Sequence, residues 1–455
     1  MTIDHKAPHR SLRLYGLFAL SLAAAMLAGC ASTPGATTTT PVPTPGTTAS
    51  PDSPGPIVLQ AWGDVTGQQT MWDTYTAQFP DQSAGQTFQA VSAGTSDSDA
   101  VAKLRLELSS GQGIPDIVQL NYSEVAEFAQ AGVLADLTDL TSSYVGNVTA
   151  AAQTLMKYNG AMVALPFEVK EKLWFYRSDL FAAAGIDPTQ VKTQDDFINA
   201  GKQLQASSPK SYIWNIAPNP SQYQWAMIVS GNGAAYSTQS PCAITVGTDP
   251  GVAQAFQAMK DLRASGVVAN FDDFTPEWQS GLDDGTVAST LSASWLPQFL
   301  EQYAPDLAGK WAVTTWPEIG GATGGSESGG SVFVIPAAST HKTEAVNFIA
   351  SMLMTQQGAA AYVAANPSYI PNVVNLLNDP SIRNNAYFGT SLIDAYLAAS
   401  NSYSIFPYDP AANAETTALS DALAKYLASS DSSPTSYLQS AQDQLTAQVG
   451  CPYQS

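Results

Sequence analysis

The alternation of patterns that decides the fold class begins with Ile57-Val58-Leu59-Gln60-Ala61-Trp62, a short apolar run that predicts a buried β-strand. A helical pattern follows from Gly67 to Phe79, and Pro80 ends it. Further strand-like and helical patterns then alternate: Phe88–Val91, Val101–Leu108 and Pro115–Leu120. This order predicts an α/β fold in which helices flank a sheet on both faces.

The alternation continues less regularly toward the C-terminus. Strand-like runs occur at Leu173–Tyr176 and Val332–Pro336, and helical patterns occur at Leu180–Ala184, Asp195–Leu204, about Lys342–Met354, and Thr417–Val449 with a Ser-rich break at Ser429–Pro434. The chain has 455 residues, of which 45% are hydrophobic, so we expect two lobes or domains with substantial cores. The net charge of −20 disfavours nucleic acid as a partner.

The N-terminus has the three parts of a bacterial lipoprotein signal peptide. Three basic residues precede an apolar run from Leu14 to Met26, and Leu27-Ala28-Gly29-Cys30 follows. The run is shorter than the roughly 20 residues of a membrane-spanning helix, which favours export. Small residues before a cysteine resemble the lipobox, in which the peptide is cut before the cysteine and the sulfur receives diacylglycerol. We therefore expect residues 1–29 to be removed and Cys30 to anchor the exported chain to the cell membrane.

The rest of the N-terminal region predicts a tether. Residues 30–56 consist of the lipidated cysteine and a segment rich in Thr, Pro, Ser and Gly, which lacks the apolar side chains needed to form a core. Beyond Cys30 only Cys242 and Cys451 remain. An even number of cysteines in an oxidising compartment favours a disulfide between them, with two unpaired buried thiols as the alternative.

Catalytic and metal-binding patterns find little support in the sequence. His341 is the one histidine beyond the signal peptide, so a multi-histidine zinc site is excluded. It stands in Ser339-Thr340-His341-Lys342, at a predicted helix start, where a surface or capping role is favoured. The Ser-x-x-Lys spacing there is weakly specific, and no Walker loop or complete dinucleotide fingerprint occurs. We expect no metal and no cofactor.

The acidic and aromatic residues leave three functional interpretations open. A secreted glycoside hydrolase would use a carboxylate pair, for which Glu168 and Glu171 are the first candidates. The 9 Trp, 19 Tyr and 16 Phe residues favour sugar binding, because aromatic faces stack on the apolar face of a pyranose while polar side chains bond its hydroxyls. Binding of another polar solute, such as a polyamine, is the third interpretation.

A series of short motifs occurs in a fixed order between Ile57 and Val449. They are Gly113-Ile114-Pro115-Asp116-Ile117-Val118, Ala129–Leu137, Tyr158–Phe167, Leu173–Ile186, Thr193–Phe197, Asp284–Trp295, Gly329–Pro336 and Ile370-Pro371-Asn372. The set resembles the bacterial extracellular solute-binding protein family 1, the sugar-binding lipoproteins of ABC importers similar to maltodextrin-binding protein. Arg177-Ser178, Gln194-Asp195 and Thr290 depart from the family's usual residues.

The resemblance implies a two-lobe periplasmic-binding-protein-like fold of type II, with a ligand cleft between the lobes at a hinge. Residues 57–166 with 317–360 would form the first lobe, and residues 167–316 with 361–455 would form the second, which then contains both Cys242 and Cys451. The implied function is that of a monomeric substrate-binding lipoprotein. It would capture a sugar or oligosaccharide and deliver it to permease subunits powered by a separate ATPase, without catalysing a reaction.

The resemblance also implies ligand-binding residues, most of them in loops after strands. Trp295 is the strongest candidate, because it matches a frequent stacking position of the family. The full set is Trp62, Asp64, Asn121, Tyr122, Phe167, Glu168, Trp225, Trp295, Trp316, Gly330, Ser331 and Tyr369. Core packing is the competing interpretation for each, and it is favoured for Trp316 and Tyr369.

Overall fold

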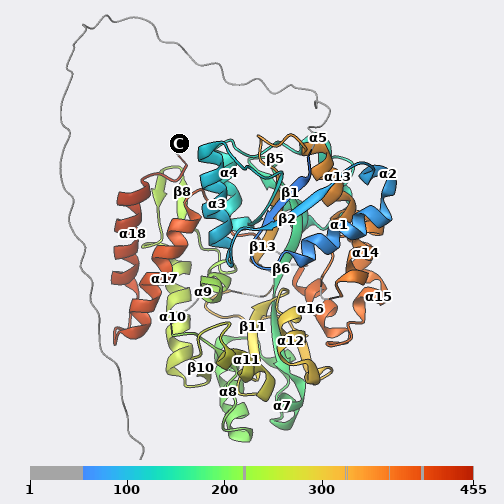
Figure 1. The fold of residues 1–455 in the computed structure, drawn as a ribbon. Coiled ribbons are helices and arrows are strands. Elements are labelled where there is room, and N and C mark those ends of the chain that lie inside the picture. The colour runs from blue at the N-terminus through green and yellow to red at the C-terminus, as the bar shows by residue number, and fades with distance from the viewer. Residues whose placement is uncertain are drawn as a thin grey trace, which may run out of the picture. The chain divides into compact units, whose positions relative to one another are not determined.

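The structure of the chain is a computed structural model that describes residues 55–218, 222–322, 324, 326–367, 369–400 and 404–453 (Figure 1). The predicted signal peptide, Cys30 and the tether as far as residue 54 lie outside the described residues. In the part of the chain that is described, no helix is both long and apolar enough to cross a membrane.

Seven strands of the described chain form one mixed sheet, with six of them in the order β11-β6-β13-β3-β1-β2 and β12 paired with β6. β1 is parallel to β2 and β3, whereas the pairs made by β6 and β13 are antiparallel. The strands are β1 (Ile57–Ala61), β2 (Phe88–Ser92), β3 (Ile117–Asn121), β6 (Ala164–Arg177), β11 (Ser289–Ala293), β12 (Trp311–Thr314) and β13 (Glu327–Val334).

The first lobe is built around the parallel strands β1, β2 and β3. Its helices begin at local signals: Ser96 accepts a hydrogen bond from the Asp99 backbone N–H at the start of α3, and Gly111 ends that helix in the left-handed region. Its other elements are α1 (Thr66–Gln78), α2 (Pro80–Ser83), α3 (Asp97–Ser110), α4 (Tyr122–Gln130), α5 (Thr138–Thr141), α6 (Ala150–Leu155), β4 (Lys157–Tyr158), β5 (Ala161–Met162), α13 (Lys342–Leu353) and α14 (Gln356–Ala365).

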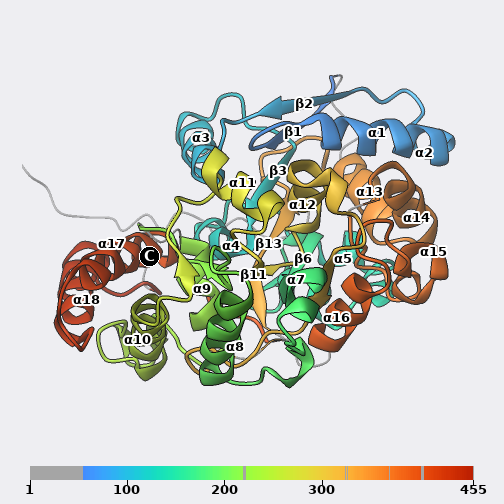
Figure 2. The same cartoon turned by 90° about the horizontal axis from the view of Figure 1, so that it is seen from below.

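The second lobe contains the C-terminal half of β6 with β11 and β12. Figures 1 and 2 both place α17 and α18 beside α10, on the opposite side of the body from α14 and α16. The other elements of the second lobe are α7 (Ser178–Ala183), α8 (Gln194–Ser207), β7 (Trp214–Asn215), α9 (Gln222–Val229), β8 (Ser237–Gln239), β9 (Cys242–Ile244), α10 (Pro250–Ala264), β10 (Val268–Ala269), α11 (Pro276–Asp284), α12 (Pro297–Tyr303), α16 (Ser391–Ser400), α17 (Ala412–Ala428) and α18 (Thr435–Val449).

β6 connects the hydrophobic cores of the two lobes. Phe167 and Val169 pack in the core of the first lobe. Farther along the strand, Trp174 packs in one core of the second lobe, while Phe175 packs in a separate core on the other face. β6 therefore passes from one lobe to the other between Val169 and Leu173, and the cavity described below lies beside this crossing.

The core memberships place the crossings beyond the expected boundaries. Phe167 belongs to the core of the first lobe rather than the second, and so do Tyr362 and Tyr369. Farther along, Ile382 of α15 (Pro380–Arg383) packs against the first lobe as well, so the later crossing follows this short helix. Ile319 and Ala322 belong to a core of the second lobe. No break in the sequence pattern marks these points, because β6 remains one continuous strand through the crossing.

The predicted alternation of strands and helices agrees with the structure. The sequence pattern nevertheless missed the N-terminal half of β6. The pattern predicted a strand over Leu173–Tyr176 alone, whereas β6 begins at Ala164. Pro166 and the charged residues after it obscure the strand in the sequence. Pro166 nevertheless stands opposite Val332 of β13, close to an irregularity in the pairing that tolerates its missing N–H.

Candidate functional site

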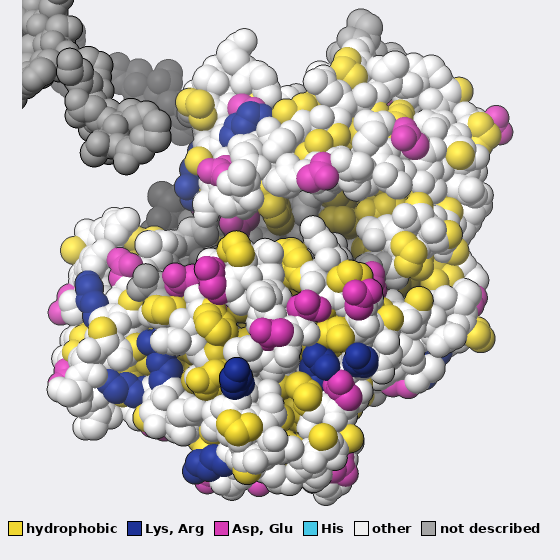
Figure 3. Space-filling model, turned by 60° about the horizontal axis from the view of Figure 1, so that its bottom comes forward, with side chains coloured by type: hydrophobic (Ala, Val, Ile, Leu, Met, Phe, Trp, Pro, Cys, Tyr) yellow, Lys and Arg dark blue, Asp and Glu magenta, His cyan; other side chains and the backbone are white. Residues whose placement is uncertain are grey.

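Described residues of both lobes line one cavity of about 720 Å³, a volume typical of small-molecule sites. Figure 3 shows a hollow between two parts of the body, with hydrophobic side chains along its edge. Eight of the predicted ligand candidates line the cavity: Trp62, Asp64, Asn121, Phe167, Glu168, Trp295, Gly330 and Tyr369. Tyr122, Trp225, Trp316 and Ser331 do not line it.

Glu168 and Lys170 project from the same side of β6 at the base of the cavity, because alternate residues of a strand share a face. Lys170 Nζ lies 3.0 Å from Glu168 Oε2, and the fully buried Ser331 donates a hydrogen bond of 3.0 Å to the same oxygen. Ser331 thus orients Glu168 without lining the cavity. Gly330 has φ +138, and a Cβ there would lie 2.8 Å from the backbone oxygen of Glu168, so the site requires glycine.

Loops of the first lobe contribute further polar groups. Asn121 is the last residue of β3 and donates a 2.5 Å hydrogen bond from Nδ2 to Asp97 Oδ2. Asp64 follows β1, and hydrogen bonds from the hydroxyl and backbone N–H of Thr66 lower the pKa of its exposed carboxyl. Three carboxylates and one ammonium therefore border the cavity, and all four come from the first lobe or from the crossing of β6.

The second lobe contributes aromatic side chains and no charged residue to the described lining of the cavity. Trp295 precedes α12, and Phe299 follows four residues later, with the two ring centroids 5.5 Å apart. Farther along the cavity, Tyr236 and Tyr408 both pack on the buried Phe406, at 4.5 and 4.8 Å. Tyr122 does not line the cavity, but its ring contacts Tyr408 across the two lobes, at 6.0 Å.

Two predicted tryptophans are instead part of the core of the second lobe. Trp225 is fully buried in α9 and donates from Nε1 to Ser420, whereas its neighbour Ala226 faces the cavity. Trp316 donates from Nε1 to the backbone oxygens of Leu173 and Ser292. We therefore leave both tryptophans out of the site proposed below.

Phe167 and Tyr369 both line the cavity, and both are largely buried. Their rings stack at 5.9 Å, and the Tyr369 hydroxyl donates to the Phe167 backbone oxygen at 2.9 Å. Burial raises the pKa of Tyr369 well above its usual value. Both residues therefore form a fixed, neutral part of the wall.

Glu171, the second candidate for a hydrolytic pair, does not line the cavity. It points to the other side of β6 from Glu168, is fully buried, and accepts a 2.7 Å hydrogen bond from Ser400. Burial raises the pKa of its carboxyl to about 8. The suggested pair is thus not assembled at the cavity.

His341 is buried against Asp116, with Nδ1 3.1 Å from the carboxylate, so a surface role is wrong for it. The Ser339 hydroxyl donates to Asp116 rather than to the histidine ring, and its oxygen accepts a hydrogen bond from the His341 backbone N–H at 3.1 Å. None of the three residues lines the cavity. Among the described residues, no group of three or more His, Cys, Asp or Glu side chains is arranged to hold a metal ion.

Several lining residues were not predicted from the sequence, namely Asp97, Lys170, Tyr236, Phe274, Gln298, Phe299 and Tyr408. The spacing of four residues between Trp295 and Phe299 could have indicated a shared helical face. Tyr236 and Tyr408 are far apart in sequence, and no local signal connects them. Their proximity depends on the packing of the second lobe around Phe406.

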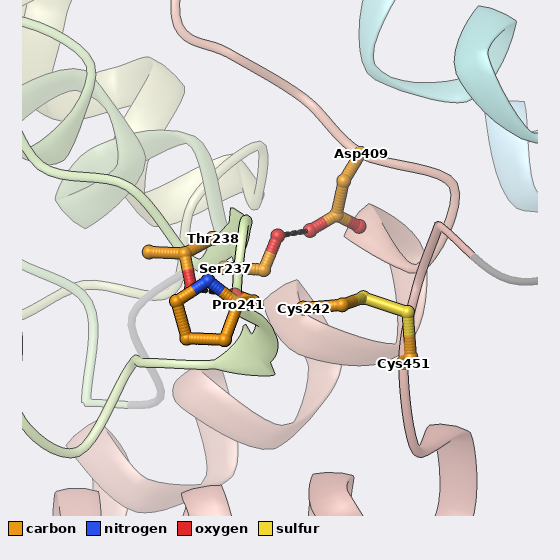
Figure 4. Close-up of a disulfide and its surroundings, with 6 residues drawn as sticks. All are labelled: Ser237, Thr238, Pro241, Cys242, Asp409 and Cys451. Atoms are coloured by element: carbon orange, nitrogen blue, oxygen red, sulfur yellow. Dashed lines mark hydrogen bonds between the residues drawn. A yellow bond between two sulfur atoms is a disulfide. The ribbon is translucent and has the colours of Figure 1, made fainter.

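Cys242 and Cys451 lie together behind this part of the cavity, with their Cα atoms 5.5 Å apart in disulfide geometry (Figure 4). Ser237, in the same β-hairpin as Cys242, donates a hydrogen bond to the buried Asp409. Each partner of that bond is next to a tyrosine of the cavity wall, Tyr236 or Tyr408. The hairpin thereby supports the tyrosines from behind.

The two lobes, the crossing strands and the cavity beside them define the class of two-lobe binding proteins. The chain matches the sequence profile described as bacterial extracellular solute-binding protein over residues 70–390. It therefore belongs to this family.

Curated relatives show the same affiliation. The arabinooligosaccharide-binding protein of Bacillus subtilis (strain 168) is 26% identical over 260 residues, which cover 56% of this chain and 59% of that protein. The lactose-binding protein of Rhizobium radiobacter is 27% identical over 335 residues, which cover 68% of this chain and 76% of the relative. The first match thus spans less than two thirds of the relative's length.

Solved structures establish the fold. The binding protein associated with an ABC transporter of B. animalis subsp. lactis Bl-04, in complex with β-1,6-galactobiose, superposes with a TM-score of 0.71 at 23% identity and covers 87% of this chain and 98% of that chain. The galacto-N-biose-/lacto-N-biose I-binding protein of Bifidobacterium longum gives 0.70 at 20% identity, with 87% and 97% coverage. The two-lobe fold expected from the sequence is confirmed.

Proposed function

We propose that the chain captures a sugar or oligosaccharide between its lobes and is the substrate-binding component of an ABC importer. The observation that carries this proposal is the composition of the cavity wall: aromatic faces from both lobes surround carboxylates, an amide and an ammonium that come from the first lobe and the crossing of β6. A pyranose offers the matching surfaces, an apolar face and a rim of hydroxyls. The names of the curated relatives, which bind arabinooligosaccharides and lactose, support the same class of ligand.

The proposed binding site consists of nine residues with defined roles. Trp295 supplies a stacking face, and Glu168 and Lys170 at the crossing of β6 bond hydroxyl groups, with Ser331 orienting the carboxylate. The remaining members are Trp62, Asp64, Asn121, Gly330 and Tyr369 from the first lobe. Phe167 forms part of the wall beside Tyr369, and Tyr122 supports the wall through its ring contact with Tyr408.

Capture would proceed by movement of the lobes about the crossings. Ligand that contacts both walls gains the full set of interactions only when the lobes are closed, so binding shifts the population toward that form. The permease, driven by a separate ATPase, would then recognise the closed form. The chain itself would act as a monomer and catalyse no reaction.

We assign the lobes from core packing. The first lobe comprises about 57–169 and 332–382, and the second about 173–322 and 387–453, with the intervening residues forming the crossings. Cys242 and Cys451 then both belong to the second lobe, so a disulfide between them would leave the hinge free.

Export and lipid anchoring complete the proposal. Residues 1–29 would act as a lipoprotein signal peptide, Cys30 would carry the lipid that holds the protein at the cell membrane, and the Thr/Pro-rich tether would connect it to the body. We expect Cys30→Ala to release the protein from the membrane fraction. Continued membrane association of that variant would contradict the anchor.

The oxidised state of the cysteine pair is a separate part of the proposal. The exported protein, denatured without reductant, should contain no free thiol at Cys242 or Cys451 when titrated with a thiol reagent. Detection of two free thiols would contradict the disulfide.

The binding experiment uses the chain Ala31–Ser455, which keeps every described residue and omits the anchor. Calorimetric titration with neutral mono- and oligosaccharides should give saturable binding at one site, and chromatography of the mixture should recover the sugar unchanged. Released product would favour a glycoside hydrolase, and binding of a diamine without binding of any sugar would favour a polyamine receptor.

A further inference from the structure

Phe274 is exposed at the cavity. Among the described residues, the large hydrophobic side chains that remain exposed are Leu106, Phe274 and Val374, and of these only Phe274 lines the cavity. Its side chain is 44% exposed. An exposed phenylalanine gains little from burial, so packing alone does not explain its position.

The backbone of Phe274 is also in an unfavourable conformation. Its φ is +63, in the left-handed region, where a bulky side chain is a genuine outlier. Such conformations persist where the surrounding structure enforces them, and they cluster at ligand sites.

Two buried amides hold the loop that carries Phe274. Asn215 donates to the Phe271 backbone oxygen and to Asp273 Oδ1, both at 3.0 Å, and accepts from the Phe271 backbone N–H at 2.8 Å. Gln224 donates to Asp273 Oδ1 at 3.1 Å. Both amide side chains are 1% exposed. These hydrogen bonds fix the loop at Phe271 and Asp273, directly before Phe274, and Gln279 Nε2 donates to the Phe274 backbone oxygen at 3.2 Å, so the backbone is held on both sides of the strained φ.

The ring of Phe274 extends the aromatic surface around Trp295. Its centroid lies 6.0 Å from that of Trp295, with 39° between the ring planes, and 5.9 Å from that of Phe299. The ring also rests on Trp278, at 5.2 Å. Phe274 and Trp295 together form a bent apolar surface that is larger than one sugar ring.

We propose that Phe274 is a second stacking platform, which holds the sugar ring next to the one on Trp295 and makes the site selective for ligands of at least two rings. This inference rests on the proposed function and narrows its ligand class to oligosaccharides. The strained loop holds the Phe274 ring in position before the ligand binds. Binding therefore costs little conformational entropy at this residue.

The test compares Phe274→Ala, Phe274→Gly and Phe274→Tyr with the unaltered chain Ala31–Ser455, by calorimetry and thermal unfolding. The probes are an oligosaccharide that binds the unaltered chain and its component monosaccharide. Leu106→Ala, an exposed apolar residue of α3 outside the cavity, is the matched control.

We expect Phe274→Ala and Phe274→Gly to weaken oligosaccharide binding roughly tenfold, and to change monosaccharide binding less than twofold. Phe274→Tyr should bind as the unaltered chain does. Phe274→Gly should melt about 1 to 3 °C above Phe274→Ala, because glycine adopts the left-handed conformation without strain. Equal losses of affinity in Phe274→Ala and Phe274→Gly, despite their different Tm values, would separate a binding role of the ring from a structural one.

Three results would overturn the inference while the proposed function stands. They are an oligosaccharide affinity of Phe274→Ala equal to that of the Leu106→Ala control, an equal loss for mono- and oligosaccharide, and an unaltered chain that binds monosaccharides alone. An unaltered chain that binds no sugar at all would contradict the proposed function itself, and the inference with it.

Discussion

The two walls contributed by the two lobes differ in chemistry although they line one cavity. The first lobe and the crossing of β6 supply every charged residue of the described lining, Asp64, Asp97, Glu168 and Lys170. The second lobe supplies Tyr236, Phe274, Trp295, Phe299 and Tyr408 and no charge. The first lobe also supplies the aromatic faces of Trp62, Phe167 and Tyr369, so a sugar that contacts both lobes would gain aromatic surface from each lobe and charged hydrogen-bond partners from the first. Under the proposed function, this shared contact is the physical basis for coupling between ligand binding and lobe closure.

Removing the aromatic face of Trp295 should have the largest effect on sugar affinity. Trp295→Ala is expected to weaken sugar binding about ten- to a hundredfold, because a partly exposed indole at the centre of an interface is a typical energetic hot spot. Calorimetry measures the change. Trp225→Phe, which alters a buried tryptophan of the same lobe, should lower the Tm and leave the affinity within twofold. Equal losses of affinity in both variants would contradict the assignment of Trp295 to the cavity and Trp225 to the core.

Removing the charge of Glu168 should have a smaller effect on sugar affinity. Glu168→Gln is expected to weaken binding about five- to tenfold, because a charge-assisted hydrogen bond becomes a neutral one and Lys170 loses its partner. Glu171→Gln changes a carboxyl on the other side of the same strand and should leave the affinity unchanged. Loss of affinity in Glu171→Gln but not in Glu168→Gln would reverse the proposed orientation of β6.

The buried carboxyl of Glu171 should make the stability of the fold depend on pH. Burial raises the pKa of Glu171 to about 8, so between pH 4.5 and pH 8 the folded chain binds more protons at this group than the unfolded chain. Stability is therefore lost as the pH rises through this window, and Glu415, with a pKa of about 9, acts in the same direction. At pH 8.5 we expect Glu171→Gln to raise the Tm by about 2 to 4 °C, and at pH 5 to leave it nearly unchanged. A variant that is less stable at pH 8.5 would contradict a buried acid.

The smallest expected effect concerns salt. A neutral sugar gains little from long-range attraction, so its affinity should change less than twofold between about 50 and 500 mM NaCl. A cationic polyamine held by Asp64, Asp97 and Glu168 would instead lose most of its affinity over that range. Calorimetry at the two salt concentrations thus distinguishes the two ligand classes on the same protein.

The residues of the two walls were not equally predictable from the sequence. Asp64 after β1 and Asn121 at the end of β3 were named through the family resemblance, and they lie near each other because the carboxyl ends of parallel strands meet at one edge of the sheet. Aromatic residues could not be sorted in the same way: Trp225 and Trp295 are the same residue type, and only the orientation of α9 shows that the first faces the core.

Phe274 and Lys170 illustrate two further limits. The left-handed conformation of Phe274 depends on amides from elements distant in sequence, Asn215 and Gln224, and no local pattern predicts it. Lys170 lies in a stretch of alternating charges that obscured the N-terminal half of β6. Both residues reach the cavity through tertiary contacts, whereas the order of strands and helices follows from local periodicity and was predictable.

The central claim, that both walls act on one sugar, is tested most directly by a calorimetric double-mutant cycle with Trp295→Ala and Glu168→Gln on the chain Ala31–Ser455. If closure is needed for either wall to act fully, the two losses should not add: the double variant should bind only slightly more weakly than Trp295→Ala alone. Strictly additive losses, or an unaltered chain that binds no sugar, would contradict the account.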